Sequence, residues 1–331
     1  MNTGKTLAPY IHAMGRGPSR SRSLTQAEAE DAMRQILDGT AAPEAVGALL
    51  MLMRFRGEIA EEVAGFTAAA RTHLDAWADV PAALDWPTYA AGRSRGLPWF
   101  LLSALLVARA GYPVLLHGWN SHQNPVADVR EAVSALAIPI TGRPDCAITA
   151  LERGRIAYVP LEAMSPEILS ILRLRDVLGL RSAMNTVCRM LNPARAACMV
   201  QGVFHPSYRA LQQDAGALLG QQNLAVLKGG GGEFERHPAK AVELYGLREG
   251  DSFYHIAPAR VDAHRRLANQ SDDRSHLLDV WSGERTDAWA EHVAIGTAAA
   301  ALSALRPGEN LVDLEDEAAA LWHARTPCLA A

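Results

Sequence analysis

The chain has 331 residues, of which 49% are hydrophobic and 21% are charged, and its formal net charge is −4. This length suits one large domain or two smaller ones of a globular protein. The longest apolar run, at about residues 99–108, is too short to span a bilayer, and the first residues lack a signal-peptide pattern. Four cysteines form no Cys-x-x-Cys pair, which argues against a zinc site and predicts a cytoplasmic protein.

Charge is unevenly distributed along the sequence. Residues 1–27 carry four basic residues and no acid, and residues 130–209 hold ten arginines against six acids. From residue 271 onward there are eleven acids against four arginines. Such asymmetry can present a basic face to a polyanion although the total charge is negative. The alternative is that these side chains only cover a solvated surface.

The first 78 residues are predicted to be helical. Thr25 and Glu28 form a capping-box signature, apolar residues then recur at helical spacing, and Asp38 and Gly39 end the run. Pro43 suits the first turn of a second helix, and a third follows. Each predicted helix has one apolar stripe, so we expect the helices to pack together or against a partner, and such stripes often form a dimer surface.

Beyond residue 79 the pattern changes to strands and helices in alternation. This succession implies β-α-β crossovers and a mostly parallel sheet, in which ligands lie beyond the carboxyl ends of the strands. The predicted strands lie within residues 112–118, 154–160, 195–203 and 223–229. The predicted helices lie at 99–110, from 166 onward, at 205–220, at 287–305 and at 314–325.

A run of four glycines follows the last predicted strand. Lys228 precedes this run, and Glu233 and Glu235 come directly after it. Backbone N–H groups of glycines can approach a phosphate closely, and carboxylates with phosphate oxygens suit Mg²⁺. No Gly-Lys-Ser/Thr follows, so the run is not a P-loop. The spacing leaves two interpretations open, a flexible loop or a ligand site.

Three further segments are candidates for anion binding. The stretch Gly92-Arg93-Ser94-Arg95-Gly96 precedes a predicted helix, whose N-terminus attracts anions. His117, Gly118 and Asn120 follow the next predicted strand, where a lone histidine is more often structural than catalytic. Three arginines, Arg173, Arg175 and Arg181, exceed what Asp176 can neutralise, so they either face solvent or bind an anion.

In chain order these segments resemble the anthranilate phosphoribosyltransferase family, also called glycosyltransferase family 3. The family's R-x-x-L-G-x-R-T-x-x-N segment matches residues 175–185 without a gap, with Ser182 in place of threonine, and Asn192-Pro193 closes it. The order of the other segments agrees over nearly the whole chain. Residues 15–37 and 92–96 are similar to a TrpD-like side branch of the family in particular.

The resemblance implies a nucleoside phosphorylase/phosphoribosyltransferase-like α/β fold. It implies an N-terminal helical domain at residues 1–78, joined in space by helices at about 165–192, and an α/β domain at residues 79–331 with a mostly parallel sheet. It also implies a homodimer through the N-terminal helices. The family's chemistry displaces pyrophosphate from phosphoribosyl pyrophosphate, with Mg²⁺ on the diphosphate.

The sequence departs from the family where the diphosphate and its metal are held. Residues 92–96 replace a Gly-Thr-Gly-Gly-Asp loop, and Pro98 and Phe100 take the positions of an asparagine and a serine, whose side chains can donate to phosphate. The family's Asp-Glu metal pair becomes Phe234-Glu235, and its Gly-Pro hinge becomes Cys188-Arg189.

These departures remove shaped ligands but keep positive charge, which suits a polyanion held by its backbone. The side branch is associated with nucleic-acid binding, so we expect single-stranded DNA or RNA as the partner and no ordinary anthranilate phosphoribosyltransferase activity. The rival hypothesis is an active transferase with an altered acceptor, which would use Mg²⁺ on Glu233 and Glu235. A third is a protein-binding scaffold. The candidate phosphate or nucleic-acid contacts are Arg16, Arg20, Arg22, Gly92, Arg93, Ser94, Arg95, Gly96, His117, Gly118, Asn120, Arg175 and Lys228.

Overall fold

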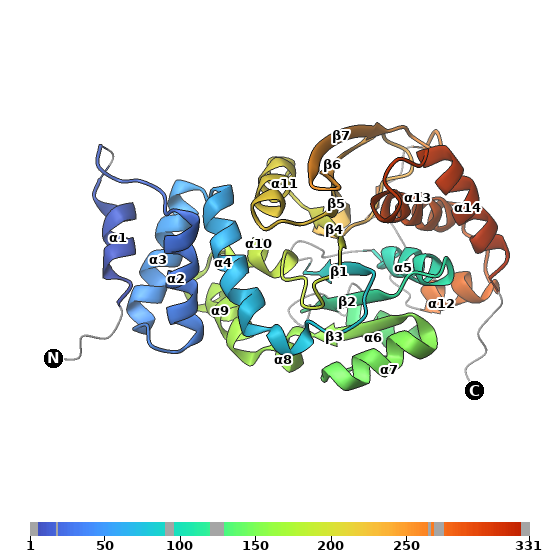
Figure 1. Ribbon diagram of the computed structural model, residues 1–331. Coiled ribbons are helices and arrows are strands. Elements are labelled where there is room, and N and C mark those ends of the chain that lie inside the picture. The colour runs from blue at the N-terminus through green and yellow to red at the C-terminus, as the bar shows by residue number, and fades with distance from the viewer. Residues whose placement is uncertain are drawn as a thin grey trace.

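The computed structural model describes residues 6–17, 19–89, 96–119, 129–263, 266–267 and 275–325. An N-terminal helical domain lies at one end of the molecule, and an α/β domain with a single large sheet forms the rest (Figure 1). The C-terminal helices α13 and α14 lie at the end opposite α1. The predicted fold class is confirmed, while the position of the domain boundary at residues 78 and 79 stays a prediction.

Two helices of the helical domain, α2 and α3, begin as the sequence predicts. The Thr25 hydroxyl accepts the Glu28 N–H, and the Glu28 carboxylate accepts the Thr25 N–H, which confirms the capping box. Pro43 occupies the first turn of the next helix. The helices are α1 (Ala8–Gly15), α2 (Gln26–Leu37), α3 (Pro43–Arg56) and α4 (Ala60–His73).

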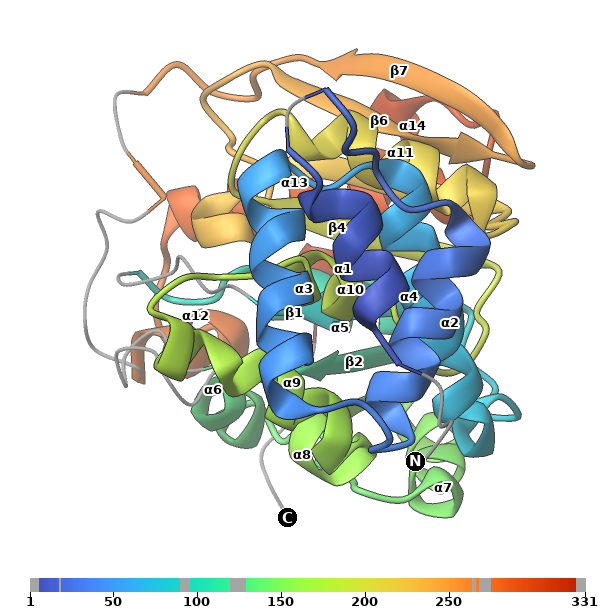
Figure 2. The same cartoon turned by 90° about the vertical axis from the view of Figure 1, so that its left-hand side faces the viewer.

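Helices from the middle of the chain share the core of the N-terminal helices. Ile168, Leu172 and Met184 belong to the same buried cluster as Met33 and Leu50. Figure 2 shows α9 and α10 close to α3 and α4 on the side of the sheet that faces the viewer. These helices are α8 (Leu161–Met164), α9 (Pro166–Leu178) and α10 (Met184–Arg189).

The sheet has seven strands in the order β3-β2-β1-β4-β5-β6-β7, and its first five strands are parallel. The last two form an antiparallel hairpin on the edge. The strands are β1 (Leu84–Thr88), β2 (Val114–Gly118), β3 (Ile156–Pro160), β4 (Cys198–Val203), β5 (Asn223–Lys228), β6 (Val242–Arg248) and β7 (Asp251–Ala257).

The two faces of the sheet meet different helices. Trp86, Val200 and Leu227 pack with the C-terminal helices on one face, whereas Leu115 and Val159 join the core of the helical domain on the other. The remaining elements are η1 (Asp75–Trp77), α5 (Phe100–Arg109), α6 (Val129–Ala135), α7 (Pro144–Gly154), α11 (Tyr208–Leu218), η3 (Gly230–Gly232), α12 (Ser275–Ser282), α13 (Ala288–Leu305) and α14 (Leu311–His323).

Several elements were not predicted from the sequence. The central strand β1 and the hairpin β6–β7 are absent from the predicted strands, and the helices α1, α6, α7, α8 and α12 are absent from the predicted helices. The predicted strands and the remaining helices are confirmed within a few residues at their ends.

Backbone contact between α2 and α4 depends on one glycine. A Cβ atom added at Gly65 would lie 2.3 Å from the Gln26 carbonyl oxygen and 2.7 Å from the Ala29 Cβ. Neither of these atoms can move without shifting α2. At Gly47 in α3, by contrast, the nearest atom to an added Cβ is a Leu178 methyl at 3.9 Å.

We expect Gly65→Ala to lower the free energy of unfolding by about 1–3 kcal/mol, because the methyl group forces α2 and α4 apart. The matched control Gly47→Ala adds a methyl group that makes only an ordinary van der Waals contact, so it should be neutral or stabilising by up to roughly 1 kcal/mol. Urea denaturation of both variants measures the difference. Equal stabilities of the two variants would contradict the close packing.

Candidate functional site

The site lies where the strand order reverses. β1 pairs with β2 on one side and with β4 on the other, so the connections that leave β1 and β4 run in opposite directions from this point. In open parallel sheets the crevice at such a point, beyond the carboxyl ends, is where ligands bind. The segments that follow β1, β2, β4 and β5 therefore line the candidate site.

Part of the predicted site lies outside the described residues. Gly92, Arg93, Ser94 and Arg95 follow β1, and Asn120 follows β2. Gly96, the first described residue after that segment, is buried with a φ of 80°. Gly118 ends β2 beside Thr88 at the end of β1.

The glycine run forms a short 3-10 turn that is packed against β4. Gly231 and Gly232 have φ values of 66° and 94°, which favour glycine. A Cβ added at Gly202 in β4 would lie 2.0 Å from the Glu233 carbonyl carbon, so only a glycine in β4 lets this turn approach. Lys228, at the end of β5, is exposed. The run is therefore a closely packed turn at a strand end.

Glu235, the retained carboxylate of the predicted metal pair, is fully buried. Its Oε2 atom accepts the backbone N–H of Phe100 at 3.1 Å. Phe100 is the first residue of α5, and this helix has no cap from its own preceding side chain. A carboxylate there satisfies one unbonded N–H group and interacts favourably with the helix dipole. Glu235 thus caps α5 from a distant part of the chain.

The apolar replacements form one aromatic cluster. Phe234 is fully buried and meets Trp86 of β1 edge to face, with ring centroids 5.5 Å apart. Phe100 stacks on Trp86 with ring centroids 6.2 Å apart. Aromatic pairs in these geometries contribute about 0.5–1.5 kcal/mol beyond the area that they bury. The positions that carry polar ligands in the resembled family therefore hold a packed core here.

The second carboxylate interacts with a different positive group. Glu233 is 1% exposed, and its charge acts on the buried Arg189 guanidinium and opposes the lowering of its pKa by burial. The described residues contain no group of three or more His, Cys, Asp or Glu side chains placed to hold a metal. Mg²⁺ binding by Glu233 and Glu235 together with phosphate oxygens stays a prediction.

Arg189 takes the place of the resembled family's hinge proline. Its guanidinium donates to the Asn185 carbonyl at 2.6 Å and to the Tyr89 carbonyl, directly after β1, at 2.8 Å. Burial lowers its pKa. The side chain thus links α10 to the end of β1, across the strand ends where the site lies.

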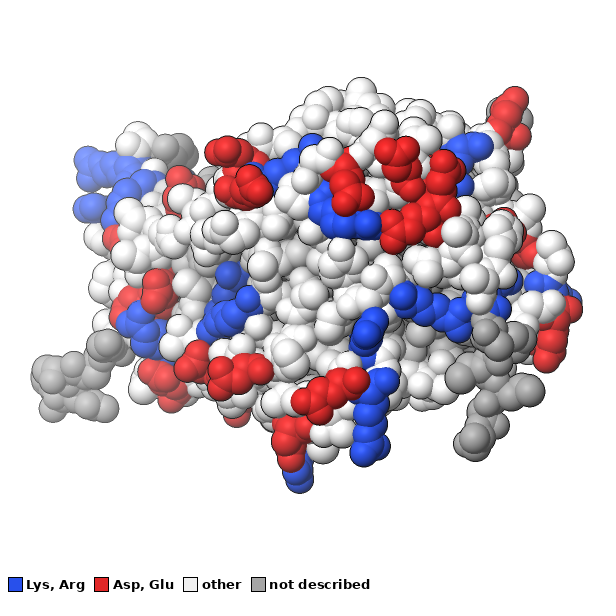
Figure 3. Space-filling view, turned by 45° about the vertical axis from the view of Figure 1, so that its right-hand side comes forward, with Lys and Arg blue, Asp and Glu red and all other residues white. Residues whose placement is uncertain are grey.

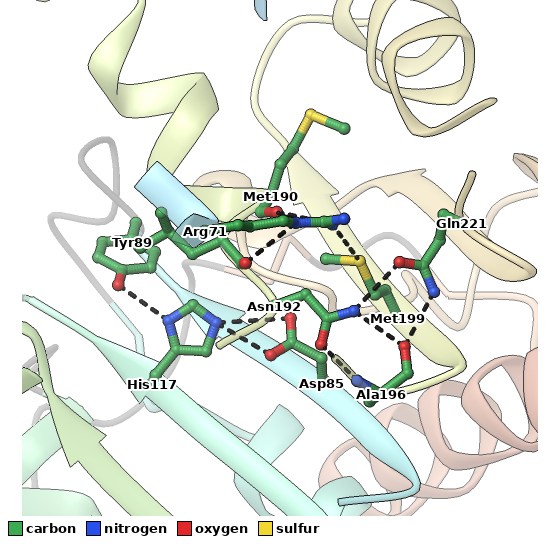
Figure 4. Close-up of polar contacts among 10 residues, drawn as sticks. Arg71, Asp85, Tyr89, His117, Met190, Asn192, Ala196, Met199 and Gln221 are labelled. Carbon is green, nitrogen blue, oxygen red and sulfur yellow. Dashed lines mark hydrogen bonds and ion pairs between the residues drawn. The ribbon is translucent and has the colours of Figure 1, made fainter. Parts of the chain in front are cut away.

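His117 belongs to a buried chain of polar groups (Figure 4). The Tyr89 hydroxyl lies 2.9 Å from Nδ1, and Asp85 Oδ1 lies 3.2 Å from Nε2. When Asp85 is ionised it can only accept, so Nε2 donates to it and Nδ1 accepts from the tyrosine. Burial raises the pKa of Tyr89 well above its usual value. His117 is therefore held inside the structure by partners from β1 and the residue after it, which supports the structural interpretation.

Arg71 is a partly buried cation that the sequence did not single out. From α4 it donates to the Met190 carbonyl at 3.0 Å and to the Leu191 carbonyl at 3.1 Å (Figure 4). Burial lowers its pKa to about 10, and the Asp85 carboxylate opposes that shift. Nearby, the Asn192 amide donates to the Ala196 carbonyl. Arg71 thus fastens the helical domain to the segment that leads into β4.

A pocket between the two domains collects arginines, and we call it the arginine pocket. Burial lowers the pKa of Arg181, and the charges of Arg175 and Arg54 add to this effect. Mutual repulsion of this kind means that the positive charges lie close together. The pocket is lined by Arg54, Glu58, Arg181, Ser182, Asn185, Thr186, Arg189, Val203, Phe204, His205, Tyr208 and Gln212.

The N-terminal arginines lie elsewhere. Arg16, Arg20 and Arg22 belong to the connection between α1 and α2, and α1 is the outermost helix in Figure 1. None of the three lines the arginine pocket. Arg22 donates to both oxygens of Glu28 at 2.6 Å, and this bond lowers the pKa of Glu28 to about 2. One of the three charges is therefore paired with an acid.

Charges of both signs intermix on the face that is drawn in Figure 3. This face includes the side of the molecule that carries the C-terminal helices. Within the described part of the chain, no helix is long and apolar enough to cross a bilayer.

Comparison with known proteins agrees with the fold and the order of the site segments. Residues 8–74 match the helical bundle domain of the glycosyl transferase family. The anthranilate phosphoribosyltransferase of Geobacillus stearothermophilus is 30% identical over 305 residues, which are 88% of this chain and 85% of that protein. The chain belongs to the anthranilate phosphoribosyltransferase family. The enzyme of Anaeromyxobacter sp. (strain Fw109-5) is 28% identical over 88% of this chain and 90% of its own.

Solved structures of anthranilate phosphoribosyltransferases share the fold over nearly the whole chain. The enzyme of Thermus thermophilus has a TM-score of 0.77 at 20% identity and covers 96% of this chain and 94% of its own. The enzyme of Saccharomyces cerevisiae in complex with phosphoribosyl pyrophosphate and Mg has a TM-score of 0.75 at 16% identity, over 96% and 93% of the two chains.

The role of Glu235 as a helix cap can be tested by stability. Glu235→Ala leaves the buried Phe100 N–H without its acceptor, so we expect a loss of about 1–3 kcal/mol in the free energy of unfolding. Glu235→Gln keeps an oxygen acceptor and loses only the charge near the helix dipole, which should cost about 0.3–1 kcal/mol.

Urea denaturation with and without Mg²⁺ gives the measurement. We expect Mg²⁺ to leave the wild type and both variants unchanged. Stabilisation of the wild type by Mg²⁺ that both variants lose would show instead that Glu235 is a metal ligand.

Proposed function

We propose that this family member binds a phosphate-bearing polyanion, and first of all single-stranded nucleic acid, in and around the arginine pocket. We further propose that it acts as a cytoplasmic homodimer and does not perform ordinary anthranilate phosphoribosyl transfer.

The arginine pocket is the observation that carries this proposal. Arg54 comes from α3 of the helical domain, whereas Arg181 and Arg189 precede and end α10, so the charges converge from separate elements. Glu58 is the one acid among the described residues that line it, and its Oε1 already accepts the Tyr208 hydroxyl at 2.9 Å. Arginine pairs with phosphate oxygens through two parallel donors, so converging arginines with few acids favour a phosphate.

The exposed aromatic side chain at the rim supports a nucleic-acid ligand. Phe204 is 46% exposed and packs edge to face on His205, with ring centroids 4.9 Å apart. Both residues line the arginine pocket. Bases of single strands stack on such rings whatever their sequence, while arginines hold the backbone. Arg93 and Arg95 follow β1 and lie outside the described residues. Their positive charge, known from the sequence alone, also supports the proposal.

The groups that would hold a magnesium diphosphate are engaged in the fold, which supports the absence of ordinary transferase activity. Glu235 caps α5, the charge of Glu233 acts on the buried Arg189, and Phe234 lies in the aromatic cluster.

The proposed dimer is supported by exposed apolar side chains on the helical domain. Phe55 at the end of α3 is 91% exposed, and Val177 near the end of α9 is 82% exposed. Large apolar side chains at this exposure often mark an interface.

An active transferase with an altered acceptor is the second candidate. It is supported by membership of the family and by the likeness to the yeast enzyme that binds phosphoribosyl pyrophosphate and Mg.

Binding of a labelled oligothymidylate over a range of salt concentrations tests the proposal. For the wild type we expect binding that weakens steeply with salt, and we expect Arg54→Ala plus Arg181→Ala to reduce the slope of log K against log salt by about 0.7 for each lost phosphate contact. The matched control is Arg153→Ala plus Arg285→Ala, two exposed arginines outside the pocket. Sedimentation equilibrium of the same samples should give twice the mass of one chain.

The control variant should keep the wild-type slope. Binding that is absent, that does not respond to salt, or that falls equally in both double variants would contradict a nucleic-acid site at the arginine pocket. A mass of one chain would contradict the dimer.

A further inference from the structure

A second groove runs beside the arginine pocket and has a different character. It lies between α11 and the turn that joins α3 to α4, and its volume is about 970 Å³. We call it the α11 groove. It is lined by Gly57, Glu58, Ile59, Ala60, Glu61, Ser207, Tyr208, Leu211, Asp214, Ala217 and Leu218.

One stripe of α11 forms a complete wall of this groove. Tyr208, Leu211, Asp214 and Leu218 follow each other at intervals of three or four residues, which places them on one face of the helix. They extend from the first to the last residue of α11, a length of about 16 Å. The opposite face of α11 is buried against the sheet through residues such as Gln213 and Gly216. The groove is therefore elongated and parallel to a helix.

The floor and the rim of the α11 groove are apolar. Val63, Ala64, Met190 and Ala215 form a separate buried cluster where α4, α10 and α11 meet, and Ala60 and Leu211 pack against it. At the rim, Ile59 is 36% exposed and Leu218 is 44% exposed. A helix of a partner protein that laid apolar side chains on this floor would cover both.

The charges of the groove are all negative. Glu61 belongs to the first turn of α4, and Asp214 belongs to α11, so acids lie on both walls. Both are exposed, and neither forms an ion pair with another described residue. No lysine or arginine is among the described residues that line the groove. A partner that contacts both walls must therefore bring positive charge, and a nucleic acid would be repelled.

Tyr208 and Glu58 separate the groove from the arginine pocket. The Tyr208 hydroxyl donates to Glu58 at 2.9 Å, and both residues line both cavities. Burial raises the pKa of Tyr208 to about 12, and the Glu58 charge adds to this shift. The two neighbouring cavities thus carry opposite charge.

We propose that the α11 groove binds a basic amphipathic helix of a partner protein, about three turns long. The apolar side of that helix lies on Leu211, Leu218 and Ile59, and its lysines or arginines pair with Glu61 and Asp214. This inference stands on the groove alone and does not depend on the proposed function of the arginine pocket.

The test uses the full chain and a labelled model peptide of leucine and lysine, about 14 residues long, patterned to place the leucines on one helical face. Fluorescence anisotropy gives its affinity for the wild type. We expect saturable binding that Glu61→Lys plus Asp214→Lys weakens at least about tenfold, because like charges then face each other. Leu218→Ser should weaken binding while leaving its salt dependence unchanged.

Two controls separate the groove from general attraction to an acidic protein. Glu44→Lys plus Glu152→Lys makes the same change of net charge at exposed helical positions outside the groove, with Glu44 in a first helical turn like Glu61. This variant should bind the peptide as the wild type does. A peptide with glutamate in place of lysine should not bind. Circular dichroism confirms that each variant is folded.

Three results would overturn the proposal. They are no saturable binding to the wild type, equal weakening by the two charge-reversed pairs, and equal affinity for the glutamate peptide.

Discussion

The hydrogen bond between the Glu235 carboxylate and the Phe100 N–H sets the arrangement of the site. It joins the turn after β5 to the first residue of α5, two segments that are 135 residues apart. A carboxylate buried at a helix N-terminus accepts a hydrogen bond from the helix, and removing the carboxylate destabilises the fold. Mg²⁺ also binds carboxylate oxygens, together with further oxygen ligands and water. The structure thus uses for stability a group that the family's chemistry uses for metal binding.

The residues around Glu235 are consistent with a structural role for this carboxylate. Phe234 and Phe100 both pack on Trp86, so the region next to Glu235 is apolar and packed. Arg236, the next residue, is fully buried, and it pairs with Glu315 of α14 and donates to the Pro258 carbonyl at 2.7 Å. The turn is therefore anchored on both sides.

Several arginine side chains lie between the domains. Arg71 is partly buried and Arg189 is buried, and both donate to backbone carbonyls, so they help to hold the domains in one arrangement. Arg54 and Arg181 line the arginine pocket and give it a positive rim. The acidic α11 groove lies directly beside this pocket. Two adjoining cavities thus carry opposite charge.

The sequence predicted the overall fold because the segment at residues 175–193 and the β-α-β rhythm are both local patterns. It did not predict β1, since Asp85 and Pro87 interrupt the strand pattern, and only a central position between β2 and β4 makes these residues a buried strand. The hairpin β6–β7 turns at Glu249 and Gly250, with φ values of 51° and 88°, and this pair lacks the asparagine or aspartate that signals such a turn.

For the site, the sequence could predict only which polar ligands of the family are missing. Pro98, Phe100 and Phe234 could be recognised as apolar at positions where the resembled family has polar ligands. The hydrogen-bond partners of the site residues could not be predicted. Glu235 contacts Phe100, His117 contacts Tyr89, and Arg71 contacts Met190, and each pair is far apart in the sequence. Contacts of this kind depend on the folded register of the sheet and leave no local pattern.

Calorimetric titration of the protein with phosphoribosyl pyrophosphate, with and without Mg²⁺, tests the central claim most directly. If the carboxylates are committed to the fold, Mg²⁺ should neither create nor strengthen binding, and any heat should reflect weak, salt-sensitive attraction to arginines. Saturable binding that requires Mg²⁺ and disappears in Glu235→Gln would contradict the claim.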